Sequence, residues 1–283
     1  MKSRICGLAV VLTGFLSSVG AAEPMTERGS YLVNSIGACG NCHARDAEGK
    51  NFHPGMTLAG GFIFDVVDPE LGHVIMPNIT PDRDTGIGKW SEADIVMALR
   101  NGKRPDGSII GPPMPIPVYR QLSDQDATAI AAYLLSVQPV RDSVQKSQYK
   151  IQLTEYGPPV THVDAPSPED KGAYGSYLVT IGDCVGCHTP PEDGKPFNMS
   201  LAFAGGRKFP GEASVSRNIT SDPDQGLGKW SDQNIKNAIT KGVRPDGTKL
   251  AGPMPYDWYA NITPADLDAI VAFMRTIKPV KNQ

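Results

Sequence analysis

Cys39-Gly40-Asn41-Cys42-His43 is a five-residue stretch that recurs later in the chain as Cys184-Val185-Gly186-Cys187-His188. C-x-x-C-H is the attachment signal for a c-type haem. Two thiols at this spacing can each form a thioether to one porphyrin, and the adjoining imidazole then lies under the iron. We therefore expect two covalently bound haem c groups. The expected attachment residues are Cys39, Cys42, Cys184 and Cys187, and the expected proximal iron ligands are His43 and His188.

Two other interpretations of the paired cysteines account for less of the pattern. A zinc site could draw its thiolates from both C-x-x-C pairs. It leaves the histidine after each second cysteine without a role. A redox dithiol of the thioredoxin kind needs a strand–helix–strand pattern around the pair, and neither pair has one. Because the histidine accompanies both pairs, the sequence favours haem.

The length and the N-terminus indicate an exported protein of two domains. The chain has 283 residues, of which 40% are hydrophobic and 20% charged, as is typical of globular proteins. Residues 1–22 are typical of a secretory signal peptide, because Lys2 and Arg4 precede an apolar run and Gly20-Ala21-Ala22 offers a cleavage point. A retained membrane anchor is the alternative, but the run is short for a membrane span. Cys6 lies in this segment and has no expected role.

Composition and motifs also exclude several classes of function. The chain has 30 acidic and 27 basic residues and no basic run, so nucleic acid is not an expected partner. No second long apolar stretch follows the N-terminal one, so we expect at most peripheral membrane association in the periplasm. The sequence has no Ser/His/Asp arrangement, Gly-rich phosphate loop or metal-dyad pattern, so we expect no substrate-transforming site.

An internal repeat divides the chain into two copies of one lobe. Asn78-Ile79-Thr80 matches Asn218-Ile219-Thr220, and this offset of 140 holds without a gap from Asn78 to Val140. The repeat predicts a first domain over residues 23–143, a linker over 144–168 and a second domain over 169–283. We expect the Pro-rich linker to pack along the surface of a lobe.

Each lobe is expected to contain short helices joined by loops, which makes the predicted fold all-α. In the first lobe, Ser91 and Asp94 form a predicted capping box, and Gly102 suits the left-handed position that ends a helix. Ser123 caps the predicted last helix. We expect this last helix to cross the first one, with Gly29 allowing a close approach. The second lobe repeats each of these residues or a near equivalent.

The sixth iron ligand decides between electron transfer and open-site chemistry. Met114 in Gly111-Pro112-Pro113-Met114-Pro115-Ile116-Pro117 and Met254 in Ala251-Gly252-Pro253-Met254-Pro255-Tyr256 obey the same offset. Prolines on both sides restrict φ and stiffen each loop. A methionine in such a loop could fill surface space only, but its recurrence favours the axial role that methionine often takes. The sequence therefore predicts Met114 and Met254 as the distal ligands.

Other repeated or solitary side chains have weaker claims. Trp90 and Trp230 could donate to haem propionates or pack in the core. The arginines of the two Arg-Pro-Asp-Gly turns could neutralise propionates or be solvated turn charges. Met274 lies on an apolar helical face and is expected in the core. The histidines without a counterpart in the repeat are expected at the surface. These are His53, His73 and His162.

The order of motifs resembles that of a known group of proteins. C-x-x-C-H is followed by N-I-T-x-D-x-x-x-G-[IL]-G-K-W-S, by R-P-D-G, by M-P and by a capped final helix that ends in Pro-Val. This order resembles the di- and trihaem cytochrome c subunits of bacterial periplasmic dehydrogenases, such as those for alcohols, gluconate and N-heteroaromatics. The resemblance covers nearly the whole chain after residue 22 and implies tandem class I cytochrome c folds with His/Met-ligated iron. The sequence differs from the trihaem members in having two boxes and no C-terminal membrane helix.

The function expected from the sequence is electron transfer rather than enzymatic catalysis. A periplasmic dehydrogenase or quinol-oxidising complex would donate single electrons, and another cytochrome or a terminal oxidase would accept them. The haems would carry the chemistry, while the protein supplies ligands and burial. The alternatives are a dihaem peroxidase or oxidase and a gas-binding sensor, both of which need an open iron site.

Overall fold

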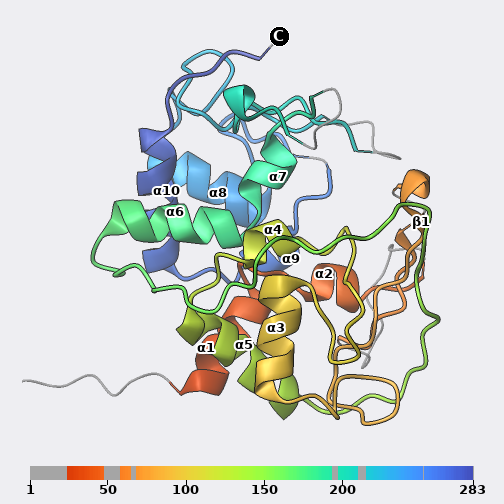
Figure 1. Ribbon diagram of the computed structural model, residues 1–283. Coiled ribbons are helices and arrows are strands. Elements are labelled where there is room, and N and C mark those ends of the chain that lie inside the picture. The colour runs from red at the N-terminus through yellow and green to blue at the C-terminus, as the bar shows by residue number, and fades with distance from the viewer. Residues whose placement is uncertain are drawn as a thin grey trace, which may run out of the picture.

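The computed structural model describes residues 24–47, 58–64, 68–192, 197–209, 215–250 and 252–282. The expected signal peptide and His53 lie outside these residues. Figure 1 shows two helical groups stacked on each other, with α1, α3 and α5 in one and α6, α8 and α10 in the other. We refer to them as the first and the second lobe.

The two lobes contain corresponding elements in the same order. The elements of the first lobe are α1 (Met25–Asn34), α2 (Gly40–His43), the 3-10 turn Pro69–Leu71, β1 (Gly72–His73), α3 (Glu92–Asn101), α4 (Ile116–Tyr119) and α5 (Asp124–Ser136). Strand β2 (Gln148–Tyr149) follows in the linker. Those of the second lobe are α6 (Lys171–Ile181), α7 (Cys184–His188), the 3-10 turn Met199–Leu201, α8 (Asp232–Lys241), α9 (Tyr256–Tyr259) and α10 (Pro264–Thr276).

The predicted helix ends are confirmed. The hydroxyl of Ser91 accepts from the backbone N–H of Asp94, and the carboxylate of Asp94 accepts from the backbone N–H of Ser91 at 2.8 Å. Gly102 follows α3 in the left-handed conformation, with φ of 62°. Ser123 caps α5 and Thr263 caps α10, each by accepting from the N–H three residues on. These side chains satisfy N–H groups that have no partner inside the helix.

The first and last helices of each lobe cross at a glycine, as predicted. A Cβ atom on Gly29 would lie 1.9 Å from the carbonyl oxygen of Ala129 in α5. A Cβ atom on Gly175 would lie 1.9 Å from the carbonyl oxygen of Ala269 in α10. Because such separations are far inside van der Waals contact, only glycine allows these two backbones to touch. Met274 packs in the core beside this crossing, with 6% of its surface exposed, as expected.

Two tyrosines join the lobes through reciprocal hydrogen bonds. In α6, the hydroxyl of Tyr177 accepts from the backbone N–H of Ser123 at 3.1 Å and donates to Oδ2 of Asp126 at 2.7 Å. In α1, the hydroxyl of Tyr31 makes the matching bonds to the N-terminus of α10 and lies 2.6 Å from Oδ2 of Asp266. Each lobe therefore helps to cap the last helix of the other lobe.

The linker adds a small element that the all-α prediction lacks. Strand β1 of the first lobe pairs antiparallel with β2 of the linker, with Gly72 opposite Tyr149. The hydroxyl of Ser147 also accepts from the N–H of Ile75 at 3.0 Å. The extended linker supplies hydrogen-bond partners to a loop of the first lobe, and two short strands result. The fold is thus mostly helical rather than purely helical, and the linker packs along the first lobe as expected.

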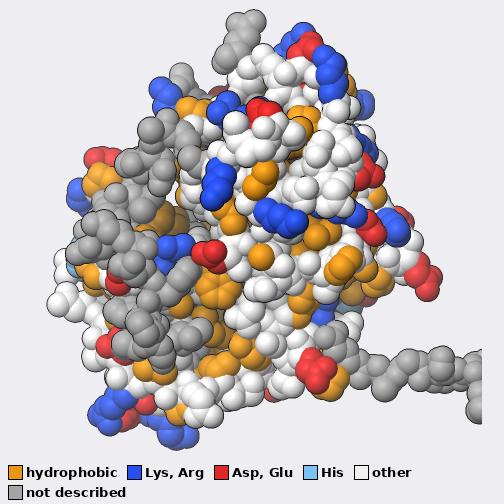
Figure 2. Space-filling view, turned by 180° about the vertical axis from the view of Figure 1, so that it is seen from behind, with side chains coloured by type: hydrophobic (Ala, Val, Ile, Leu, Met, Phe, Trp, Pro, Cys, Tyr) orange, Lys and Arg blue, Asp and Glu red, His pale blue; other side chains and the backbone are white. Residues whose placement is uncertain are grey.

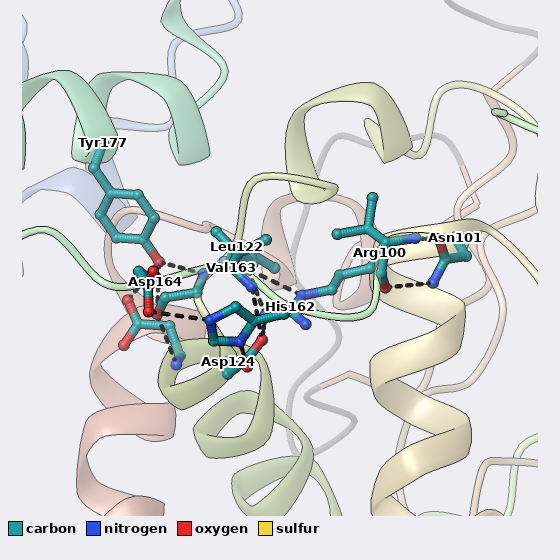
Figure 3. Close-up of polar contacts among 11 residues, drawn as sticks. Arg100, Asn101, Leu122, Asp124, His162, Val163, Asp164 and Tyr177 are labelled. Atoms are coloured by element: carbon teal, nitrogen blue, oxygen red, sulfur yellow. Dashed lines mark hydrogen bonds and ion pairs between the residues drawn. The ribbon is translucent and has the colours of Figure 1, made fainter. Parts of the chain in front are cut away.

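A charged network holds the far end of the linker (Figure 3). Asp124, the first residue of α5, accepts from the N–H of Val163 at 3.1 Å and from Arg100 at 2.6 Å. His162 lies between two carboxylates, with Nδ1 2.6 Å from Asp124 and Nε2 3.1 Å from Asp164. Both contacts raise the pKa of His162, with the hydrogen bond to Asp124 as the larger cause. His162 lies at the surface, as expected, and it fastens the linker to the first lobe.

We expect Gly175→Ala to lower the free energy of unfolding by about 1–3 kcal/mol or more, because the added methyl group forces α6 away from α10. The matched control is Gly172→Ala in the same helix, where a Cβ atom would have its nearest neighbour at 3.4 Å. That substitution should stabilise the helix by roughly 0.5–1 kcal/mol or leave it unchanged. Urea unfolding of the holoprotein measures both. Equal effects of the two substitutions would contradict the close crossing.

We also expect the contribution of His162 to stability to depend on pH. Its pKa is raised in the folded protein, so the stabilisation is complete below 6.5, the ordinary value, and disappears as the pH rises through the folded value. Asp124 stays ionised throughout because these partners lower its pKa to about 2. The difference in unfolding free energy between the wild type and His162→Gln should therefore shrink as the pH is raised above 6.5. A difference that does not change with pH would refute the ion-pair role.

Candidate haem-binding sites

The two C-x-x-C-H boxes form short helices in equivalent places. In the first lobe, Cys39 precedes α2, and its carbonyl accepts from the N–H of His43 at 3.0 Å. Side chains three and four residues apart on one helical turn face the same side. The thiols of Cys39 and Cys42 are free of disulfide bonds, and burial raises the pKa of Cys39 to about 12. In the second lobe, α7 presents Cys184, Cys187 and His188 in the same order.

A backbone carbonyl orients each histidine of the boxes. Nδ1 of His43 lies 2.8 Å from the carbonyl oxygen of Pro77, and Nδ1 of His188 lies 2.7 Å from that of Arg217. A carbonyl only accepts, so Nδ1 carries the proton and the lone pair of Nε2 remains for a metal. Burial lowers the pKa of both imidazoles and so favours the neutral form that binds iron.

The carbonyl that orients His43 is itself held by a buried clamp. Directly after Pro77, the side-chain oxygen of Asn78 accepts from the N–H of Thr80 at 2.9 Å and from its hydroxyl at 2.7 Å. The amide nitrogen of Asn78 donates to the carbonyl of Val140 at 2.8 Å. Only 3% of Asn78 and none of Thr80 is exposed. The clamp therefore ties the loop whose carbonyl orients His43 to the segment that follows α5.

The second lobe repeats this clamp with nearly the same distances. Asn218 accepts from the N–H and the hydroxyl of Thr220 at 2.9 and 2.7 Å and donates to the carbonyl of Val280 at 2.7 Å. Two features of the sequence point to this clamp: the repeated Asn-Ile-Thr triplet and the gapless alignment of the two lobes from Asn78 to Val140. Sequence reasoning gave the asparagines no role because their partner is a backbone carbonyl far along the chain.

Tyrosines anchor the methionine-bearing turns to the haem boxes. Met114 lies in the turn before α4, and Tyr119 at the end of α4 donates to the carbonyl of Gly37 at 3.3 Å, just before the first box. Met254 lies in the turn before α9, and Tyr259 donates to the carbonyl of Gly182 at 3.0 Å. Both methionines are partly buried and pack against the hydrophobic core. Each turn is thus held beside its box by a hydrogen bond.

The first box borders a cleft with apolar walls. Its lining residues are Leu32, Ile36, Gly37, Cys39, Leu99, Tyr119, Leu122, Ile130 and Ile181. The last of these belongs to the second lobe, whereas the others belong to the first. Two free thiols, a neutral imidazole with an available Nε2 and an apolar wall are the groups that a covalently attached haem requires. The residues therefore fit the cofactor that the motif predicts.

The remaining candidates have structural contacts of their own. Among the described residues, no group of three or more His, Cys, Asp or Glu side chains converges to hold a metal ion. Trp90 and Trp230 are partly buried and pack against the core, which agrees with their interpretation as core aromatics. Arg104 donates to the carbonyl of Ile109 at 3.0 Å within its own turn. Arg244 lies 5.9 Å above the Trp230 ring.

We expect Asn78→Ala to lower the free energy of unfolding by about 1–3 kcal/mol, because it leaves the buried N–H of Thr80 without its acceptor and removes the Asn78 amide that donates to the Val140 carbonyl. Asn237→Ala is a matched control, since this asparagine of α8 makes an exposed hydrogen bond with Gln233, and its effect should stay within about 0.5 kcal/mol. Denaturant unfolding of the holoprotein measures both. If Asn78→Ala were as mild as the control, the clamp would not support the site.

Several curated proteins are similar to this chain over nearly its whole length. It is 30% identical to the cytochrome c subunit of the quinone alcohol dehydrogenase of Gluconacetobacter polyoxogenes, over 95% of this chain and 59% of the relative. It is 31% identical to the fructose dehydrogenase cytochrome subunit of Gluconobacter japonicus, over 93% of this chain and 54% of the relative. The chain thus spans less than two thirds of the length of these relatives. A diheme cytochrome c-type protein of Cereibacter sphaeroides is 28% identical over 99% of both chains.

The family model for cytochrome c matches the chain twice, over residues 26–138 and 173–278. Each match contains one C-x-x-C-H box, one Asn-Ile-Thr triplet and one methionine-bearing turn. No helix among the described residues is both long and apolar enough to cross a membrane. The chain belongs to the cytochrome c family, whose members hold haem c through covalent bonds.

Proposed function

We propose that the protein is a dihaem c-type cytochrome that carries single electrons from a periplasmic dehydrogenase to a downstream cytochrome or terminal oxidase. One observation carries the proposal. Each lobe contains a neutral imidazole oriented by a carbonyl and a methionine turn anchored to the same box. A pair of axial ligands closes the iron to exogenous molecules and suits electron transfer.

The side chains have distinct roles in this proposal. Cys39 and Cys42 attach the first haem, and His43 and Met114 ligate its iron. The equivalent residues Cys184, Cys187, His188 and Met254 serve the second haem. The bound haem supplies a one-electron ferric/ferrous couple. The clamp at Asn78 keeps Nε2 of His43 directed at one place, so that the protein reorganises little when the charge changes.

The relatives support the proposed donor. Those named above are cytochrome subunits of alcohol and fructose dehydrogenases, and a gluconate 2-dehydrogenase subunit of Pantoea cypripedii matches over 91% of this chain. The diheme protein that matches end to end supports a count of two haems. The signal-peptide pattern of residues 1–22 supports export of the chain. In this proposal, the haems are attached to the exported protein.

The face shown in Figure 2 and the small net charge favour docking that relies on shape more than on a strong electrostatic field. In Figure 2, Lys and Arg side chains lie among Asp and Glu side chains, and hydrophobic groups appear between them. The whole chain has a formal net charge of −3 at pH 7. A weak field gives little long-range steering. We therefore expect association with the donor to depend only modestly on ionic strength.

We expect Met114→Ala and Met254→Ala each to remove about half of the near-infrared Met–iron charge-transfer band of the oxidised protein, because each removes one axial sulfur. Met199→Ala is the matched control, since Met199 is 62% exposed, and it should leave the band unchanged. If either axial variant matched the wild type, that iron would have another ligand or none.

Carbon monoxide binding to the reduced protein separates the carrier from the enzymatic alternative. The wild type should bind none, because both iron atoms have two protein ligands in this proposal. Each axial variant should bind one equivalent. Binding by the wild type would indicate an open haem and favour the dihaem peroxidase or sensor interpretation.

A further inference from the structure

A tryptophan of the second lobe packs against the first haem box. A Cβ atom on Gly40 would lie 2.2 Å from Cη2 and 2.5 Å from Cζ2 of Trp258. The six-membered ring of the indole therefore rests on the backbone of α2, between the two attachment cysteines in sequence. Gly40 is buried by this arrangement, and only glycine leaves enough room for the ring.

The pair departs from the internal repeat at both of its positions. Gly40 corresponds to Val185 in the second box, and Trp258 corresponds to Val118 in α4. Trp258 is larger than Val118, and Gly40 is smaller than Val185. The larger side chain thus fills the space that the glycine leaves, as close packing requires. The contact therefore serves the first box specifically.

The ring has little freedom to move away from the box. Tyr259, the next residue of α9, is tied to the carbonyl of Gly182 at 3.0 Å. Asn261 donates across the lobe boundary to the carbonyl of Asn34 at 3.0 Å. Tyr31 then fastens the N-terminus of α10 to α1 at 3.2 Å. The bond of Tyr259 thus fixes α9 within the second lobe, and the bonds at Asn261 and Thr263 hold the segment directly after α9 against the first lobe.

We propose that Trp258 is a positioning residue for the first-lobe haem, which keeps water away from the attachment turn and so raises the reduction potential of that haem. The proposal rests on the proposed dihaem function. Ferric haem carries one more positive charge than ferrous haem, and water stabilises the more highly charged form. Burial of a haem site accordingly raises its potential. The second lobe thereby sets the potential of the first haem.

The first experiment is a spectroelectrochemical titration of the holoprotein and of Trp258→Ala. The wild type should show two one-electron waves. In the variant, one wave should move to lower potential by about 59 mV, which is a tenfold change in the equilibrium of electron exchange between the haems. The other wave should stay in place. Trp258→Phe keeps an aromatic ring over Gly40 and should restore most of the potential.

Two further variants assign the moved wave to the first box. Gly40→Ala should displace the ring and move the same wave in the same direction, and the double variant should show no additional shift, since both changes break one contact. Val118→Ala, at the position equivalent to Trp258, should move neither wave in this way. Haem content and thermal unfolding show whether each variant is folded.

Three results would overturn the proposal while leaving the electron carrier intact. These are two unchanged waves in Trp258→Ala, an equal shift of both waves, and the same shift in Val118→Ala. A Trp258→Phe variant with the potential of Trp258→Ala would also count against it. A wild type without two waves and without a Met–iron band would instead overturn the proposed function itself.

Discussion

The bond between a histidine Nδ1 and a backbone carbonyl is the constraint on which each lobe depends. For His43, this bond fixes the tautomer and directs Nε2 towards one place. The carbonyl of Pro77 cannot move freely, because Asn78 next to it is fastened to Val140, beyond the last helix. Three segments far apart in sequence are thereby joined at the imidazole: the box, the Asn-Ile-Thr turn and the end of the lobe. Folding of a lobe consequently also orients the imidazole of its box.

The contact between the lobes has the pseudo-twofold symmetry of a homodimer interface. Tyr31 and Tyr177 occupy equivalent positions, and each bonds to the start of the last helix in the opposite lobe. In an isologous interface, residue i of one copy contacts residue j of the other, and the reverse contact also occurs. Here both copies belong to one chain. The linker can therefore follow the first lobe closely, as the pairing of β1 with β2 shows, without having to bring the lobes together by itself.

Much of this arrangement could be predicted from local patterns, because the responsible interactions lie within a few residues. The capping box at Ser91, the left-handed Gly102 and the close crossing at Gly29 each depend on short-range geometry that residue type reveals. The carbonyl partners of the box histidines and of Asn78 could not be predicted, since a backbone acceptor leaves no mark on the residue type. The strand pair of the linker was missed for the same reason. Ligation by the methionines stays a prediction.

The positions at which the two lobes differ show how their boxes are distinguished. Most residues that build a box and its clamp are the same in both lobes, so one arrangement of the imidazole occurs twice. Gly40 and Trp258 differ from Val185 and Val118, and the difference lies where the lobes meet. Two identical haem environments would share an electron equally. Under the proposed function, unequal environments give the two haems different potentials, and a substitution at the lobe boundary can change one site without disturbing the bonds that build both.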